Sequence, residues 1–175
     1  YAPGYHKIIQ DAHKSNKSWF SPGLKGIFKD LNFPFFFMDF ETVQQGVPII
    51  KGTKPNYALP FQWSVHKLES IDKKIELNDA ESFLKFDDQD IERKFVEELL
   101  KAVGNHGTIF VHSAYEEKAL ERLKDKDNCK DLADKIDKLI ARIKDTLPIV
   151  RKNFYSPLMN GKHGIKSIIK ATAPS

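Results

Sequence analysis

The chain has 175 residues, of which 41% are hydrophobic and 30% charged, with a formal net charge of +4 at pH 7. This length suffices for one ordinary domain with a substantial core. No apolar run approaches the roughly 20 residues that a membrane-spanning helix needs, and the N-terminal residues show no signal-peptide pattern. The single cysteine, Cys129, excludes an internal disulfide and fits the reducing conditions of the cytoplasm.

Residues 1–32 precede the first strong structural signal, and we expect them to form a leader or the tail of a preceding region. As far as Phe20 they show no clear hydrophobic period. Ser21-Pro22-Gly23 then predicts a turn. Helical spacing follows it, at Leu24, Ile27, Phe28 and Leu31.

A dense apolar run over Phe33–Thr42, FPFFFMDFET, predicts a strand buried on both faces. Side chains of a strand alternate, so Asp39 and Glu41 point the same way, about 7 Å apart. Two carboxylates this close in an apolar setting must take up a proton, pair with a cation or bind a metal. Positions 30–50 contain no Lys or Arg, so a hard divalent cation is the natural partner. In the alternative interpretation the strand ends at Phe40 and Glu41 is simply solvated.

The remaining elements alternate between strands and helices. Pro60–Leu68 predicts a half-buried strand, and Lys74–Leu77 a short third one. Asp87–Val103 has a helical stripe that an Asp caps and Gly104 ends. The later elements are a strand at Thr108–His112, a helix after Tyr115, a helix from Asn128 that includes Ile143, and a short helix at Ile165–Ala171.

This order predicts an α/β fold with a mixed sheet flanked by helices, and an acidic pair on its first strand suggests the ribonuclease-H-like architecture. The run Asp39-Phe40-Glu41-Thr42 and the block Pro60-Phe61-Gln62-Trp63-Ser64-Val65-His66 resemble the bacterial family called domain of unknown function 2779, as does the tail from Tyr155 to Gly161. That family is similar to the DEDD exonucleases, which have a ribonuclease-H-like fold. The resemblance implies such a domain over residues 33–175, with Asp39 and Glu41 binding catalytic Mg²⁺ or Mn²⁺.

The DEDD pattern also needs an Asn-x-x-aromatic-acid motif where a later strand meets its helix. The chain has His112-Ser113-Ala114-Tyr115-Glu116-Glu117 there, so the aromatic-acid pair matches but the Asn is missing. We expect Glu116 to be the third metal-side acid, with Glu117 as the alternative. Ser113 and Glu116 could instead form a capping box at the start of the helix.

Asp145 is the next candidate that the resemblance implies near a catalytic site, although its position also suits a helix cap. The family's final Asp, behind a Tyr or His on a closing helix, is not found before Ser175, so we expect the last element to lie beyond this chain. His163, in a glycine loop, could serve as a base but is more typical of an exposed residue. Lys162 and Lys166 are candidates to hold a nucleic-acid backbone.

Two hypotheses for function follow. The first is a metal-dependent 3′–5′ exonuclease that hydrolyses DNA or RNA, acting at a single-stranded end by a two-metal mechanism. The second is an inactive ribonuclease-H-like module that binds nucleic acid or a partner protein. A weaker third possibility is a structural domain in which the acids of Asp39 and Glu41 only pair with a distant Lys.

Overall fold

A computed structural model describes residues 4–48, 50, 53–73, 82–86 and 90–173. These residues form two compact units. The sheet unit comprises residues 32–144, and the terminal unit comprises residues 1–31 together with 145–175. No helix among the described residues combines the length and apolarity that crossing a membrane requires.

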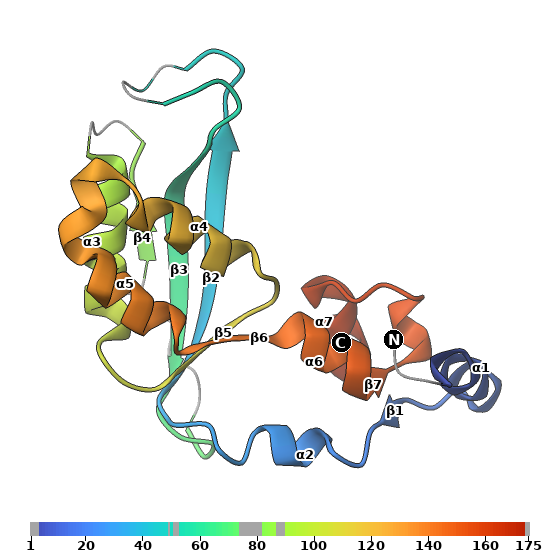
Figure 1. The fold of residues 1–175 in the computed structure, drawn as a ribbon. Coiled ribbons are helices and arrows are strands. Elements are labelled where there is room, and N and C mark those ends of the chain that lie inside the picture. The colour runs from blue at the N-terminus through green and yellow to red at the C-terminus, as the bar shows by residue number, and fades with distance from the viewer. Residues whose placement is uncertain (1–3, 49, 51–52, 74–81, 87–89, 174–175) are drawn as a thin grey trace. The chain divides into compact units, whose positions relative to one another are not determined.

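The sheet unit is built on a mixed sheet in the strand order β4-β3-β2-β5-β6 (Figure 1). The strand β2 is central, antiparallel to β3 and parallel to β5, and β3 pairs antiparallel with β4. The predicted α/β class and mixed sheet are therefore confirmed. The strands are β2 (Phe35–Gln44), β3 (Ala58–Leu68), β4 (Ser82–Leu84), β5 (Thr108–Val111) and β6 (Ile143–Asp145).

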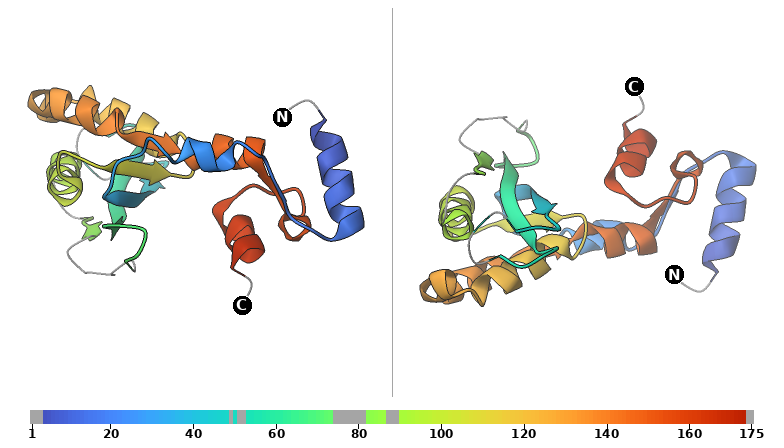
Figure 2. Two further views of the ribbon diagram at one scale, coloured as in Figure 1. Left: turned by 90° about the horizontal axis from the view of Figure 1, so that it is seen from below. Right: turned by 90° about the horizontal axis from the view of Figure 1, so that it is seen from above.

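The core of the sheet unit lies on one side of β2. Phe36, Met38 and Phe40 are at most 5% exposed and belong to a single cluster with buried residues of the helices. These helices are α3 (Ile91–Val103), α4 (Tyr115–Lys124) and α5 (Ala133–Ile140). Figure 2 shows α3 to one side of β2 and β3 in views from below and from above. Trp63 lies in the same core, where its indole N–H donates to the carbonyl of Phe95 at 3.1 Å.

Several boundaries differ from the sequence-based expectations. The segment after Asn128 is a 3₁₀ helix, η2 (Asp127–Leu132), followed by α5. Ile143 begins β6 instead of continuing the helix, because the chain turns at Ala141 and Arg142. The strand predicted at Lys74–Leu77 falls outside the described residues.

Two contacts fix the loop between α3 and β5. Gly107 has φ +90° and packs so closely on Pro34 that an added Cβ would lie 2.3 Å from the Pro34 carbonyl oxygen. Arg142 donates to the carbonyls of Val103, Gly104, His106 and Gly107. One guanidinium therefore satisfies carbonyls at the end of α3 and in the loop that leads into β5.

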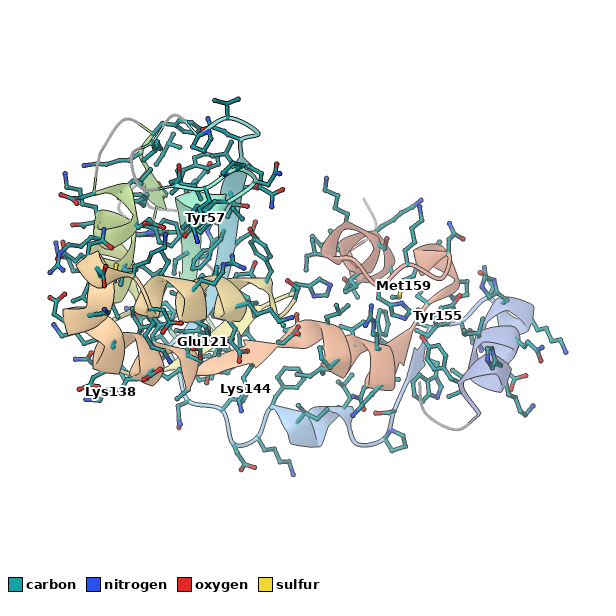
Figure 3. The ribbon with its side chains drawn as sticks, turned by 45° about the horizontal axis from the view of Figure 1, so that its top comes forward. Tyr57, Glu121, Lys138, Lys144, Tyr155 and Met159 are labelled. Carbon is teal, nitrogen blue, oxygen red and sulfur yellow. The ribbon has the colours of Figure 1, made fainter. Side chains whose placement is uncertain are left out.

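A polar cluster ties the start of β3 to the helices. Tyr57, labelled in Figure 3, donates to Glu92 Oε1 at 2.5 Å. The Lys126 ammonium lies 4.1 Å from the Tyr57 ring centroid and 3.3 Å from the same Glu92 oxygen. Burial, with the Glu92 carboxylate adding to it, raises the pKa of Tyr57 far above its ordinary value. The phenol therefore stays protonated and remains a donor.

The terminal unit joins both ends of the chain. Its strands β1 (Trp19–Phe20) and β7 (Phe154–Tyr155) pair antiparallel. Tyr5 and Ala12 of α1 pack against Tyr155 in a small core, and Figure 3 labels Tyr155 and Met159 in this unit. Its helical elements are α1 (Tyr5–Ser15), α2 (Leu24–Ile27), α6 (Thr146–Asn153), the 3₁₀ helix η3 (Pro157–Met159) and α7 (Ile165–Thr172).

The sequence analysis missed α1 and extended α2 too far. The helix expected through Phe28 and Leu31 ends at Ile27. The helix α1 depends on a distant residue, because its buried side chains pack against Tyr155.

Candidate active site on the open face of the sheet

The two faces of β2 differ sharply in exposure. Phe36, Met38 and Phe40 are buried, whereas Phe37, Asp39 and Glu41 alternate with them and are exposed. The prediction of a strand buried on both faces is therefore wrong. The five phenylalanines among residues 33–42 obscure the alternation of buried and exposed positions in the sequence, because both faces are apolar over the first half of the strand. We call the face that bears Phe37, Asp39 and Glu41 the open face.

Exposure changes the electrostatic argument for the acidic pair. Asp39 and Glu41 do lie two positions apart on one face of a central strand, as predicted. Since both side chains are exposed, they keep much of their hydration, and desolvation no longer forces a counter-charge. Mutual repulsion at about 7 Å remains. Among the described residues, neither acid forms an ion pair, so no described lysine neutralises them.

The strand β3 supplies the polar neighbours of these acids. Asp39 lies opposite Ser64, Glu41 opposite Gln62, and Phe37 opposite His66. Directly opposed residues of an antiparallel pair project from the same side of the sheet. Ser64, Gln62 and His66 therefore share the open face, and all three are half-buried.

The ladder between β2 and β3 becomes irregular directly after the acidic pair. Glu41 pairs with Gln62 but Thr42 pairs with Pro60, so β3 carries one extra residue at this point. Such bulges change the direction of a strand and are common beside active sites. The acidic pair thus sits at the end of the regular part of β2.

The start of α4 is attached to this end of the strand. The side-chain oxygens of Thr42 and Tyr115 share a hydrogen bond. Ser113 accepts from the Tyr115 backbone N–H at 3.1 Å and donates to Glu116 Oε2 at 3.4 Å. The motif that sequence analysis singled out is therefore anchored to the strand that carries the acids.

Glu116 and Glu117 occupy different environments within that first turn. Glu116 is 5% exposed and interacts with Ser113, whereas Glu117 is half-buried. A buried carboxylate needs hydrogen bonds or a cation, and Ser113 supplies one such bond. The side chains of Ser113 and Glu116 do meet, but the N-cap of α4 is Ala114 and it has no side-chain cap bond, so Ser113 is not the N-cap that the suggested capping box requires. The assignment of either glutamate as a metal ligand stays a prediction.

Asp145 and the candidate basic residues belong to the terminal unit. Asp145 caps α6, where its carboxylate accepts from the Leu147 backbone N–H at 2.8 Å. Lys162 and Lys166 are exposed. The roles predicted for these three residues in catalysis or nucleic-acid binding are not tested by this arrangement.

His163 is not the exposed loop histidine that its glycine neighbours suggested. It is 8% exposed, and its Nε2 lies 2.8 Å from the Tyr5 hydroxyl. The burial of His163 could have been anticipated only from residues 5–15, whose apolar side chains have the helical spacing of α1. That helix carries Tyr5, which contacts His163. His163 therefore serves the packing of the terminal unit.

No group of three or more His, Cys, Asp or Glu side chains is arranged to hold a metal within the described parts of the chain. Two carboxylates nevertheless fit one magnesium ion. This ion keeps several water ligands and often takes only one or two carboxylates from the protein, together with phosphate oxygens of a substrate. The donor set of Asp39 and Glu41 is consistent with that mode of binding.

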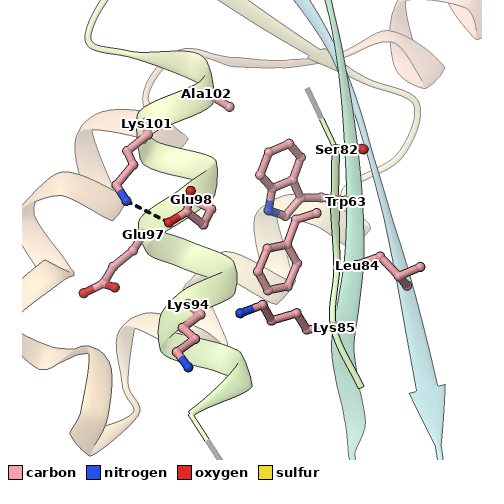
Figure 4. A pocket seen from close by; sticks show the side chains of 10 residues that line it. Trp63, Ser82, Leu84, Lys85, Lys94, Glu97, Glu98, Lys101 and Ala102 are labelled. Carbon is pink, nitrogen blue, oxygen red and sulfur yellow. Dashed lines mark hydrogen bonds and ion pairs between the residues drawn. The ribbon is translucent and has the colours of Figure 1, made fainter. Parts of the chain in front are cut away.

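A separate hollow of about 670 Å³ lies between α3 and β4 (Figure 4). Trp63 and Phe83 line it together with charged residues, including an ion pair between Lys101 and Glu98. Since Trp63 belongs to the buried side of the sheet, this hollow is on the face opposite to Asp39. None of its lining residues is a site residue predicted from the sequence.

Comparison with known proteins gives a family but no activity. No curated protein and no solved structure matched the chain. A family model described as a domain of unknown function, DUF2779, matches residues 36–164, which include the acidic strand, the β5–α4 junction and most of the tail motif. Because this match covers more than half of the chain, the protein belongs to the DUF2779 family.

Proposed function

We propose that the sheet unit is a ribonuclease-H-like domain that hydrolyses phosphodiester bonds of DNA or RNA as a metal-dependent, 3′–5′ exonuclease-like enzyme. The observation that carries the proposal is the exposure of Asp39 and Glu41 on the open face of β2, the central strand of the sheet and its first in chain order. A strand whose other face is buried holds the two carboxylates at a fixed spacing. Nothing in the packing of β2 requires acids at these positions.

Asp39 and Glu41 would hold Mg²⁺ or Mn²⁺, with Glu116 or Glu117 as a further carboxylate. The metal supplies an activated water and stabilisation of the leaving oxygen in two-metal hydrolysis. The protein's part is to fix the carboxylates. The bond between Thr42 and Tyr115 supports this, because it connects the strand of the acids to the turn that carries Glu116.

A degradation assay tests the proposal. Oligonucleotides of single-stranded DNA and RNA, labelled at either the 5′ or the 3′ end, are incubated with the chain in Mn²⁺, in Mg²⁺ and in a chelator. We expect shortening from the 3′ end that needs the metal and disappears in Asp39→Asn and Glu41→Gln. Asp72→Asn is the matched control, since Asp72 is an exposed acid in a turn. Cleavage that persists in both site variants, or none by the full-length protein with either metal, contradicts the proposal.

The second candidate is an inactive ribonuclease-H-like module that binds nucleic acid or a partner protein. The absence of a three-ligand metal group among the described residues favours it. The two candidates differ in one outcome of the same experiment. A binding module slows the migration of the labelled oligonucleotide in a native gel but does not shorten it.

A further inference from the structure

A row of aromatic side chains leads along β2 to the acidic pair. Phe33, Phe35 and Phe37 occupy alternate positions that end at Asp39. The rings of Phe33 and Phe35 stack with centroids 3.9 Å apart. Phe37 stacks on Phe110 of β5, with centroids 5.5 Å apart and an interplanar angle of 20°. The row is therefore a supported surface and not a set of isolated side chains.

Phe37 is the accessible member nearest the acids. It is 37% exposed, whereas Phe110, beside it on the neighbouring strand β5, is 5% exposed. A buried ring thus holds an exposed one in place, which leaves part of the Phe37 surface free for another flat group. Exposed aromatic rings on a strand commonly serve as platforms on which nucleic-acid bases stack.

A buried polar atom that has no hydrogen-bond partner among the described residues belongs to the side chain beside this platform. His66 lies directly opposite Phe37 on β3. Its Nδ1 is buried and has no hydrogen-bond partner among the residues that the structure describes. Buried polar atoms are nearly always paired, so such an atom calls for an explanation. The side chain is half-buried, and a ligand on Phe37 would lie next to it.

We propose that Phe37, supported by Phe110 and flanked by His66, is a stacking subsite for one base of a single-stranded nucleic acid. The inference rests on the proposed function, because it places that base beside the phosphodiester bond held at Asp39 and Glu41. Two strand positions separate Phe37 from Asp39, a step of roughly 7 Å. That step is comparable with the length of one extended nucleotide.

The character of the surface favours a nucleic acid over a protein segment as the occupant. An apolar helix would bury Asp39 and Glu41 together with Phe37, because all three lie on one strand face, and burying unpaired charges is costly. A single strand instead offers a base to Phe37 and a phosphate to a metal at the acids. The chain's net charge of +4 also attracts a polyanion.

The test measures binding separately from cleavage. The parent is the chain with Asp39→Asn and Glu41→Gln, which removes both the proposed catalysis and the repulsion between acids and phosphates. The probe is a fluorescein-labelled oligothymidine, followed by anisotropy. Phe37→Leu keeps the apolar character but loses the flat ring, and Phe37→Trp enlarges the ring. Phe20→Leu is the matched control, since Phe20 is 57% exposed and packs on the buried Phe154.

We expect Phe37→Leu to weaken binding of the oligothymidine by about 5- to 150-fold, since stacking of a base on an aromatic side chain contributes roughly 1–3 kcal/mol. Phe37→Trp should bind at least as tightly as the parent, and Phe20→Leu should not differ from it. The Tm of Phe37→Leu should stay within about 5 °C of the parent, because an exposed ring contributes little to the core.

Two results overturn the subsite. One is parental affinity in Phe37→Leu. The other is a larger fall in Tm together with equal loss of binding in Phe37→Trp, which marks Phe37 as a packing residue. Either result leaves metal-dependent cleavage by the native acids untouched. Conversely, if the full-length native protein does not cleave, but Phe37→Leu loses binding while Phe37→Trp and Phe20→Leu keep it, the proposed function fails and the subsite stands.

Discussion

Tyr115 and Thr42 share a hydrogen bond that joins the first turn of α4 to the residue after Glu41. Removing the Tyr115 hydroxyl should loosen this junction while the ring and its contact with the Arg122 guanidinium remain. We expect Tyr115→Phe to lower the free energy of unfolding by about 1 kcal/mol, the usual net contribution of one hydrogen bond. Urea denaturation followed by circular dichroism measures it. An unchanged midpoint means that the bond contributes nothing to stability.

Among the glycines that the structure describes, Gly107 is the one whose replacement should cost most. Alanine there would require a left-handed φ of +90° and would place Cβ 2.3 Å from the Pro34 carbonyl oxygen. Since backbone atoms cannot move aside easily, we expect Gly107→Ala to lower the free energy of unfolding by about 2–4 kcal/mol. Gly26→Ala is the control, because nothing lies within 4 Å of its added Cβ. Equal stability of the two variants contradicts the close approach.

Cys129 gives the chain a dependence on alkaline pH. Burial raises the pKa of its thiol from 9.0 to about 11. The folded state therefore keeps the proton that the unfolded state loses. This contribution to stability is complete below pH 9 and is lost as the pH rises towards 11. We expect the free energy of unfolding to fall over that range more steeply in the native chain than in Cys129→Ala.

Comparing the two proteins removes the effect of every other group whose protonation changes over that range. Parallel curves for the native chain and Cys129→Ala between pH 8.5 and 11 contradict the shifted thiol. A second readout follows from the complete burial of Cys129. The thiol should react with a disulfide reagent at pH 8 only after denaturation, since it is both covered and protonated.

The central strand shows what local pattern can and cannot predict. Alternation and strand-forming residues located β2 and placed Asp39 and Glu41 on one face, and both features hold. The same pattern could not show that this face is open, because Phe35 and Phe37 are as apolar as Phe36. Exposure depends on what the rest of the chain brings to each face, which no local window contains.

The terminal unit was hidden for the same reason. Tyr5 and Ala12 have helical spacing, but the residue that completes their small core, Tyr155, lies far along the chain. His163, expected to be an exposed loop residue, is buried, and its contacts include a hydrogen bond with the distant Tyr5. The capping role of Asp145 could be predicted from the sequence, because an Asp before Thr-Leu-Pro is a typical helix N-cap. In the structure Asp145 caps α6.

The acidic pair on the open face is the central feature of the proposal, and a titration of the chain with Mn²⁺ by isothermal calorimetry tests it most directly. The account predicts saturable binding that Asp39→Asn and Glu41→Gln each weaken at least about tenfold, about 1.4 kcal/mol, while Asp72→Asn leaves it unchanged. Manganese that binds both site variants as tightly as it binds the native chain contradicts a metal site at Asp39 and Glu41.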